Sequence, residues 1–389
     1  MQVPLLDLKA QYAGIRDEVR SVVDQVLESQ RFVLGSHVET LEKEIALFCG
    51  VSHAVGLASG TDALLLSLKA VGVGPDSAVV TVPYTFFATA GAIVNLGAQP
   101  LFVDIEEAGF NMDPGRLSSF LQSECSFNLT THRLVHKASN REVRAILPVH
   151  LYGQCADMGD ILEIARRYLL PVVEDSCQAL GARYEGRAAG TIGDCGCISF
   201  FPSKNLGGAG DGGMVVTDSE ELASRVRLLR THGGVRKYYH SVVGYNSRLD
   251  ELQAAILRVK LGHLADWNEA RRRNAAAYEA GFRAAGLLAC VRTPAVLPGR
   301  DHIYHQYVIR CQRRDDLKAH MTAKGIGTEI YYPVSLHEQE CFGYLGYRPS
   351  DFPRAREASH ETLALPVYPE LSSEQRSYVV SSIAEFYLK

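Results

Sequence analysis

The sequence has no long apolar run. No stretch of its 389 residues approaches the ~18 consecutive apolar residues that a membrane-spanning helix needs. The opening, MQVPLLDLKAQYAGIRDEV, contains acidic residues early and lacks the continuous apolar segment of a secretory signal. The sequence therefore supports neither membrane insertion nor export, and we expect a cytoplasmic protein.

A disulfide or metal framework is also missing. The nine cysteines are scattered from Cys49 to Cys341 in an odd number without repeating spacing, which favours reduced thiols. Cys195 and Cys197 lie too close together and lack the second Cys/His pair of a zinc site, so we interpret them as buried strand residues. No metal site is expected.

Neither charge sign is in excess. The chain has 40 basic and 44 acidic residues, a net charge of -4, which gives no electrostatic reason to expect nucleic acid or an anionic membrane as a partner. Its 47% apolar and 22% charged residues are typical of a globular protein. At ~150 residues a domain, the length predicts two or three domains. The composition does not exclude a small polar molecule as the ligand.

Short apolar runs alternate with amphipathic segments between about residues 54 and 230. This pattern predicts an α/β fold with a mostly parallel sheet covered by helices. Before it, Ser36 and Glu39 have capping-box spacing and predict the start of a helix in an N-terminal arm. Asp157 and Ser219 are predicted to cap two covering helices.

The pattern changes after residue 244. A long helix is predicted from Leu249 through Arg271, Arg272 and Arg273, and we interpret this arginine run as a solvated face. Beyond Pro294, a strand (HQYVIRC), a helix capped near Asp315, a strand (GTEIYY) and two closing helices predict a smaller α+β domain. The expected division is 1–244 for the arm and large domain, and 245–389 for the linking helix and small domain.

Lys204 lies in the stretch SFFPSKNLGGAGDGGMVV, directly after a predicted strand and before several glycines. A lysine held beside a buried strand without an adjoining acid has a lowered pKa and can form a Schiff base with an aldehyde. The alternative is a solvated loop lysine. The glycines do not match the phosphate-loop pattern, so nucleotide hydrolysis is disfavoured.

Asp175 ends another predicted strand, and Gln178 follows three residues later. Ligands bind at the carboxyl edge of parallel sheets, and a carboxylate there can pair with the protonated nitrogen of a pyridoxal ring. Gln178 could donate to a ring oxygen. The alternatives are a helix cap for Asp175 and a surface amide for Gln178.

Two further segments could complete such a site. Ser59, Gly60 and Thr61 precede a helix, where free N–H groups can bind a phosphate, although an ordinary N-cap explains them equally well. In VPYTFFATA, one of Tyr84, Phe86 and Phe87 could stack on a flat ring, or all three could belong to the core.

Taken together and in this order, these motifs resemble the pyridoxal-phosphate-dependent nucleotide-sugar aminotransferases of the DegT/DnrJ/EryC1/StrS group. The similarity extends from PLLDLKAQY through GYNSRLDELQAAIL to LALPVYPELSSEQ, essentially the whole chain. It implies the fold of PLP-dependent fold type I, which is aspartate aminotransferase-like, with pyridoxal 5'-phosphate as cofactor.

The resemblance also implies roles for individual residues. Lys204 would be the Schiff-base lysine and the acid/base, Asp175 would pair with the ring nitrogen, and Gln178 would approach the ring oxygen. Phe86 would stack on the ring, and the phosphate would be held by Gly60, Thr61 and Ser199, with Asn246 from a neighbouring subunit, which implies a homodimer with shared sites. The implied substrate contacts are Arg248, the lid cations Arg236 and Lys237, Tyr331, which stands where relatives often have histidine, and His337.

The implied reaction transfers an amino group from glutamate to a keto sugar carried by a nucleoside diphosphate, at C3, because PLLDLKAQY and GYNSRLDELQAAIL look like the 3-aminating members. Alternatives are amination at C4, a sugar dehydratase, which related proteins achieve with histidine in place of the lysine, and a non-catalytic relative. Segment 123–144 is longer and more polar than the usual connection, and would add a surface loop or reshape an edge of the site.

Overall fold

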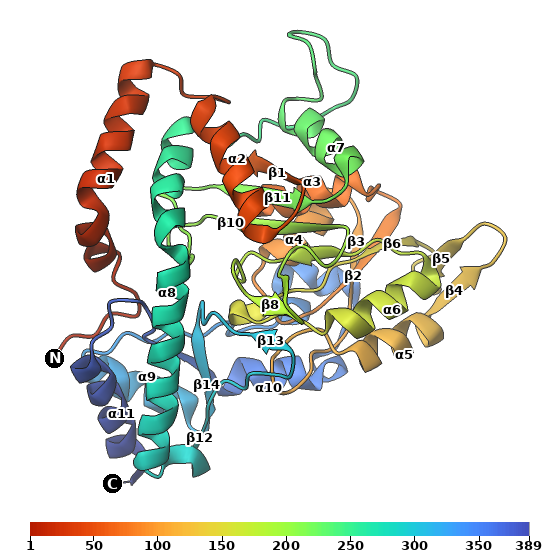
Figure 1. Ribbon diagram of the computed structural model, residues 1–389. Helices are drawn as coiled ribbons and strands as arrows, with labels where there is room; N and C mark the ends of the chain where they lie inside the picture. Colours follow the sequence, from red (N-terminus) through yellow and green to blue (C-terminus); the bar gives the residue numbers. More distant parts are fainter. Residues whose placement is uncertain (389) are drawn as a thin grey trace.

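A mostly parallel sheet forms the centre of the molecule (Figure 1). The computed structural model describes residues 1–388. Two parallel bridges, Ile146 to Val172 and Val149 to Asp175, join a four-stranded and a five-stranded sheet edge to edge. The resulting strand order is β3 (Gln99–Phe102), β2 (Ser77–Thr81), β6 (Glu142–Ile146), β7 (Val173–Asp175), β10 (Cys195–Ser199), β11 (Gly213–Thr217) and β1 (His53–Leu57). Within this order only β11 runs antiparallel, so the predicted sheet is confirmed.

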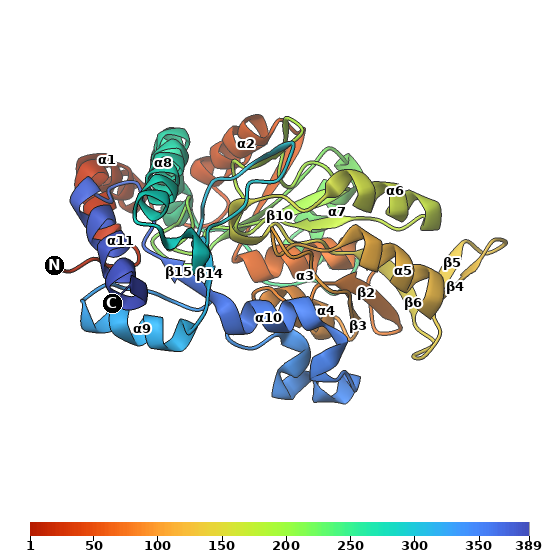
Figure 2. The ribbon, with the colours of Figure 1, turned by 90° about the horizontal axis from the view of Figure 1, so that it is seen from below.

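Helices cover both faces of this sheet, as Figure 2 shows. Strand residues alternate between the two layers: Cys195 and Cys197 pack on one side, as predicted for buried strand cysteines, and Ile198 on the other. The first face is covered by α3 (Gly60–Ala70), α4 (Ala88–Asn95) and α7 (Glu220–Arg230). The second is covered by α2 (Ser36–Cys49), α5 (Pro114–Glu124), α6 (Met158–Tyr168) and α8 (Glu251–Ala284).

The long helix α8 runs along one side of the molecule, with α1 (Leu8–Ser29) beside it (Figure 1). It leads to a second, antiparallel sheet, β12 (Val291–Arg292), β14 (Tyr307–Cys311) and β15 (Thr362–Leu365), with α9 (Arg314–Ala323), α10 (Pro353–Glu361) and α11 (Ser373–Leu388). Val3 pairs with Ile326, so the first residues pack with this second sheet. The division at 244 and 245 stays a prediction.

The remaining elements are short. Arg300–Asp301 (β13), Arg183–Tyr184 (β8) and Arg187–Ala188 (β9) form a small sheet. The longer segment noted in the sequence forms a hairpin of β4 (Cys125–Asn128) and β5 (Arg133–His136) that projects from the body (Figure 1). Short 3-10 helices lie at Leu151–Gly153, Leu287–Ala289, Leu336–Glu338, Glu340–Leu345 and Pro349–Asp351. Within residues 1–388 no helix is long and apolar enough to cross a membrane.

Three predicted helix caps are wrong. Asp315 lies inside α9 and its carboxylate accepts from the Arg314 side chain rather than from the first N–H groups of the helix. The side chains of Ser36 and Glu39 form no capping box; instead, the buried Glu251 carboxylate accepts the N–H groups of Gly35, His37 and Val38 at 2.8 to 2.9 Å. Asp157 precedes α6 but its carboxylate accepts from Tyr184 and Arg300 rather than from the helix. The Ser219 cap is confirmed, because its hydroxyl accepts the N–H of Leu222.

Two predictions for the second half also need correction. The arginine run is not uniformly solvated, because Arg271 is buried and its Nη1 donates to the carbonyls of Tyr304, His305 and Val367. The stretch GTEIYY is not a strand; it pairs only through an isolated bridge between Glu329 and Ala364. The strand at 307–311 and the closing helices are confirmed.

Candidate active site

The predicted site residues converge on one edge of the main sheet. Strands β1, β2, β7 and β10 run in the same direction, so their carboxyl ends lie at a common edge. Asp175 ends β7, Lys204 follows β10, Phe86 follows β2, and α3 begins just after β1. This edge is where α/β sheets bind ligands.

Lys204 is half-buried and is not a solvated loop lysine. Burial lowers the pKa of its ammonium, and the nearby groups of Cys177 and Asp175 act in the opposite direction. Its Nζ has no hydrogen-bond or ion-pair partner among residues 1–388, while its backbone N–H donates to Phe201. The glycine-rich segment lets the chain turn tightly here: a Cβ at Gly207 would lie 2.3 Å from the carbonyl oxygen of Pro202. Lys204 is thus a lysine whose amine is free to react and more easily deprotonated than usual.

The carboxylate of Asp175 is buried and held in place by two donors. Oδ2 accepts from the hydroxyl of Thr89 at 2.7 Å, and Oδ1 accepts from the N–H of Cys177 at 3.3 Å. No helix follows Asp175, so the alternative of a helix cap is wrong. Thr89, on α4, was not singled out from the sequence because it lies 86 positions from Asp175.

Gln178 is buried, so it is not a surface amide. Its Oε1 accepts from the N–H of Tyr152 and its Nε2 donates to the hydroxyl of Tyr332, both at 2.8 Å. One N–H of the amide is therefore already used, and the other is left for a ring oxygen. Burial raises the pKa of the Tyr332 phenol, which stays protonated. The sequence analysis missed Tyr332, although it adjoins Tyr331.

The start of α3 offers an anion site. The Ser59 hydroxyl accepts the N–H of Asp62 in an ordinary N-cap, but the N–H groups of Gly60 and Thr61 have no acceptor in the described part of the chain. A Cβ at Gly60 would lie 2.6 Å from the Cβ of Ser199, so only glycine allows this close contact. The two free amides and the Ser199 side chain form a cup at a helix N-terminus, where a phosphate is stabilised.

The three aromatic residues after β2 have different environments. Tyr84 is fully buried, and its hydroxyl donates to the carbonyl of Tyr331 at 2.5 Å. Phe87 stacks on Phe342 with 5.4 Å between ring centroids. Phe86 is 56% exposed, and its ring lies 6.3 Å from that of Tyr332, so it is the one of the three available to stack on a ligand.

The predicted contacts from other segments lie outside this cluster. Asn246 is exposed and accepts from Arg248, and the neighbouring Ser247 donates to Asp62 at the start of α3. Arg236 and Lys237 sit in the projecting loop 232–243 at the top of Figure 1, where they stack on Tyr239 and Tyr238 of the same loop. In this chain alone, these two cations are not brought to Lys204.

The prediction that His337 contacts the substrate is wrong. Its side chain is fully buried, with its ring 4.8 Å from that of Phe352 in an aromatic cluster, so it cannot touch a sugar. The turn Leu336–Glu338 packs into the core, which carries the imidazole inward. Tyr331 is half-buried and lines a small cavity that also includes Ser203, next to Lys204.

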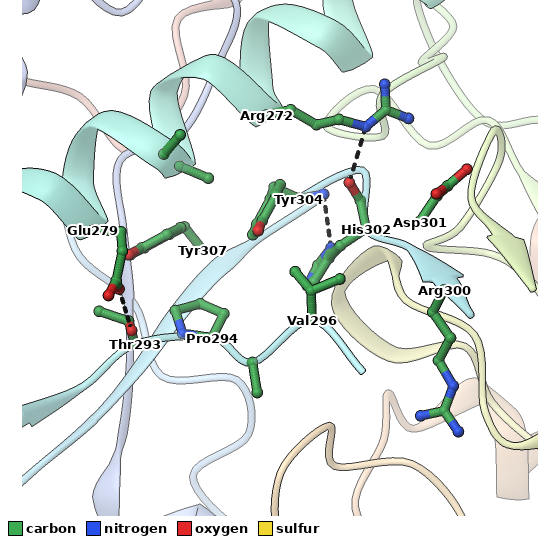
Figure 3. A pocket seen from close by; sticks show the side chains of 13 residues that line it. Arg272, Glu279, Thr293, Pro294, Val296, Arg300, Asp301, His302, Tyr304 and Tyr307 are labelled. Carbon is green, nitrogen blue, oxygen red and sulfur yellow. Dashed lines mark hydrogen bonds between the residues drawn. The ribbon is translucent and has the colours of Figure 1, made fainter. Parts of the chain in front are cut away.

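A separate open pocket of about 560 Å³ lies between α8 and segment 293–304 (Figure 3). Some of its polar groups pair with one another: Arg272 donates to the carbonyl of His302, and Thr293 donates to Glu279. None of the predicted site residues lines it. The candidate active site is therefore the sheet edge around Lys204.

Comparison with known proteins agrees with this geometry. Residues 14–384 match the model of the DegT/DnrJ/EryC1/StrS aminotransferase family. The chain is 48% identical to the pleiotropic regulatory protein of Geobacillus stearothermophilus, covering 100% of this chain and 99% of that protein. It is 41% identical to the UDP-N-acetyl-3-dehydro-alpha-D-glucosamine 3-aminotransferase of Acidithiobacillus ferrooxidans, with 98% and 97% covered.

Among solved structures, DesV of Streptomyces venezuelae, in complex with a ketimine intermediate, superposes with a TM-score of 0.91 at 39% identity, covering 99% of this chain and 98% of that one. The family model, the relatives and this structural match each span nearly the whole chain. The chain belongs to the DegT/DnrJ/EryC1/StrS aminotransferase family.

Proposed function

We propose that this protein is a pyridoxal-phosphate-dependent aminotransferase that transfers the amino group of glutamate to C3 of a keto sugar carried by a nucleoside diphosphate. The observation that carries the proposal is the half-buried Lys204 amine, free of partners and close to the Asp175 carboxylate at the carboxyl edge of the sheet. The C3 position is supported by the similarity to the Acidithiobacillus ferrooxidans 3-aminotransferase.

The residues present fit the cofactor. Lys204 would hold it covalently, Asp175 would pair with the ring nitrogen, and Gln178 would approach the ring oxygen. The free amides of Gly60 and Thr61, with Ser199, would hold the phosphate, and the exposed ring of Phe86 would cover the ring face. When bound, pyridoxal phosphate supplies an electron sink that acidifies the C–H bond beside the amino group.

Lys204 also moves the proton. Because burial lowers its pKa, its amine is neutral more often than an ordinary lysine and can remove the proton from the donor Cα. The resulting ammonium returns a proton, and the same group works in reverse on the sugar carbon. Thr89 keeps the Asp175 carboxylate oriented while this occurs. Glutamate leaves as 2-oxoglutarate, and the keto sugar leaves as an amino sugar.

The alternatives are less well supported. A sugar dehydratase of this kind would have histidine in place of Lys204. The Geobacillus stearothermophilus relative is named a regulatory protein, but a non-catalytic role does not require Lys204, Asp175 and Gln178 to lie together at one sheet edge.

The proposal includes a cytoplasmic homodimer with shared sites. Support for the dimer comes from the exposed Asn246 and from exposed apolar side chains, including Phe32, Val33 and Phe201. In a dimer, loop 232–243 would bring Arg236 and Lys237 to the partner's substrate diphosphate. The nine free cysteines agree with a reducing compartment.

The test is product analysis with matched substrates. Holoenzyme is incubated with glutamate and either a 3-keto or a 4-keto nucleotide sugar, and the product is examined by NMR. We expect an amine at C3; an amine only at C4 would overturn the position but not the aminotransferase assignment. Lys204→Ala should abolish turnover and the borohydride-stable link to the cofactor. Lys260→Gln is the matched control, since burial also lowers the pKa of Lys260 but its ammonium donates to the carbonyl of Gly207.

A further inference from the structure

A small cavity of about 180 Å³ lies beside Lys204. Ser203, which directly precedes the lysine, forms part of its wall. The rest of the lining comes from segments far apart in sequence, and it combines a largely apolar surface with a few polar groups. The apolar members are Leu5, Leu6, Ala364, Leu365 and Val367, and the other polar members are Arg271, His305, Gln306 and Tyr331.

Arg271 is a buried cation without a carboxylate partner. It is 2% exposed, and Nη1 donates to three backbone carbonyls, but Nε has no acceptor. Among residues 1–388 no carboxylate lies within 4.0 Å of its guanidinium; Glu370 acts on it only through space. Burial lowers its pKa to about 10, which leaves it charged at neutral pH. A buried charge that is not neutralised is costly, and a ligand carboxylate would offset that cost.

The lining of the cavity also includes His305. His305 donates from Nδ1 to Asn205 Oδ1, because the amide nitrogen of Asn205 itself donates to Asn268. Burial and the ammonium of Lys204 hold the pKa of His305 well below its ordinary value, so it stays neutral and adds no second charge.

We propose that this cavity binds the side chain of the amino donor, with Arg271 pairing with its distal carboxylate. The inference rests on the proposed aminotransferase function. The apolar lining would contact the methylene groups of glutamate, while its amino group remains at Lys204. Because Arg271 faces this cavity and Arg272 faces the separate pocket of Figure 3, the two neighbouring arginines provide a matched pair.

The test is calorimetric titration of the holoenzyme with glutarate, a five-carbon dicarboxylate that cannot react, and with pentanoate, which has one carboxylate. Loss of one hydrogen-bonded charge pair corresponds to about tenfold or more in affinity. We therefore expect glutarate to bind about tenfold tighter than pentanoate in the wild type and in Arg272→Gln, and this preference to disappear in Arg271→Gln. Unchanged glutarate affinity in folded Arg271→Gln would overturn the proposal.

A second variant covers the case in which Arg271→Gln does not fold. Leu6→Phe fills the cavity and leaves Arg271 in place; it should weaken glutarate binding and raise the KM for glutamate, while the KM for the keto sugar stays constant. Unchanged glutarate binding by Leu6→Phe would count against the proposal. If Arg271→Gln transfers the amino group as well as the wild type does, this inference is refuted and the proposed function stands. Arg271-dependent glutarate binding without any transfer to a keto sugar refutes the proposed function alone.

Discussion

Replacing Glu251 should destabilise the protein strongly, although the loop that its side chain contacts, residues 31–35, is mostly exposed. This residue begins α8, yet its buried carboxylate accepts N–H groups at the start of α2: that of Gly35, just before the helix, and those of His37 and Val38 in its first turn. Its own N–H donates to the carbonyl of Phe32. One side chain thereby fixes the start of α2 and the loop before it against α8.

The magnitude follows from these contacts. Each hydrogen bond to a charged group is worth about 1.5–3 kcal/mol, but bonds that share one carboxylate are not additive, so we expect Glu251→Ala to cost about 3–5 kcal/mol. Glu251→Gln keeps the shape and one acceptor oxygen but turns an NH₂ group toward backbone donors, and should cost about 1.5–3 kcal/mol. Gly35→Ala should also destabilise the protein, because its Cβ would lie 2.8 Å from the Glu251 carboxyl carbon.

The controls are the residues that the sequence pattern favours as the cap. Ser36 and Glu39 are exposed and do not cap the helix, so Ser36→Ala and Glu39→Gln should change the free energy of unfolding by about 0.5 kcal/mol or less. Urea denaturation followed by circular dichroism measures all five variants. A loss in Ser36→Ala as large as that in Glu251→Ala would refute the reasoning.

Three further predictions concern the candidate active site. Lys204→Met should stabilise the cofactor-free protein at pH 7, because burial lowers the pKa of this lysine and the folded state therefore holds its proton less well than the unfolded chain. This gain in stability should shrink as the pH rises toward the ordinary lysine pKa, where the unfolded chain also loses the proton. Thermal melts from pH 7 to 10 test this, and a gain that grows with pH would contradict it. Thr89→Val removes the donor to Asp175 and should weaken cofactor binding about tenfold, measured by equilibrium dialysis, whereas unchanged affinity would show that Thr89 does not position the carboxylate. Mixed dimers of Lys204→Ala and Asn246→Ala subunits should regain activity in one site of two, and no recovery after verified subunit exchange would count against a shared site.

The central sheet and its functional edge could be predicted from the sequence. Apolar runs such as GMVVTD and PVVED become buried strands, and a parallel sheet brings the residues after them to one edge. Lys204 and Asp175 could therefore be placed together without knowledge of any contact. The side chains that orient them, Thr89 and Tyr332, come from distant segments, and nothing in the local pattern links them to the site.

The corrections have physical reasons of two kinds. Glu251 caps α2 across more than 200 positions, and a local capping-box rule does not reach that far. Arg271 was different, because a signal existed: Leu264, Arg271 and Tyr278 are spaced by seven, so the arginine shares a helix face with two buried residues. Reading the arginine run as one solvated group overlooked this spacing.

The pairing of Val3 with Ile326 imposes an order on folding. Two backbone hydrogen bonds hold Val3, one to the carbonyl of Gly325 and one from the N–H of Gly327. Closing a loop of about 320 residues carries a large entropic cost unless the intervening chain is already compact. Leu5 and Leu6, which wall the cavity beside Lys204, are carried into place by this same closure. Leu5 and Leu6 thus reach their native contacts only after the chain has been synthesised as far as Ile326, and the wall of the cavity is completed with them.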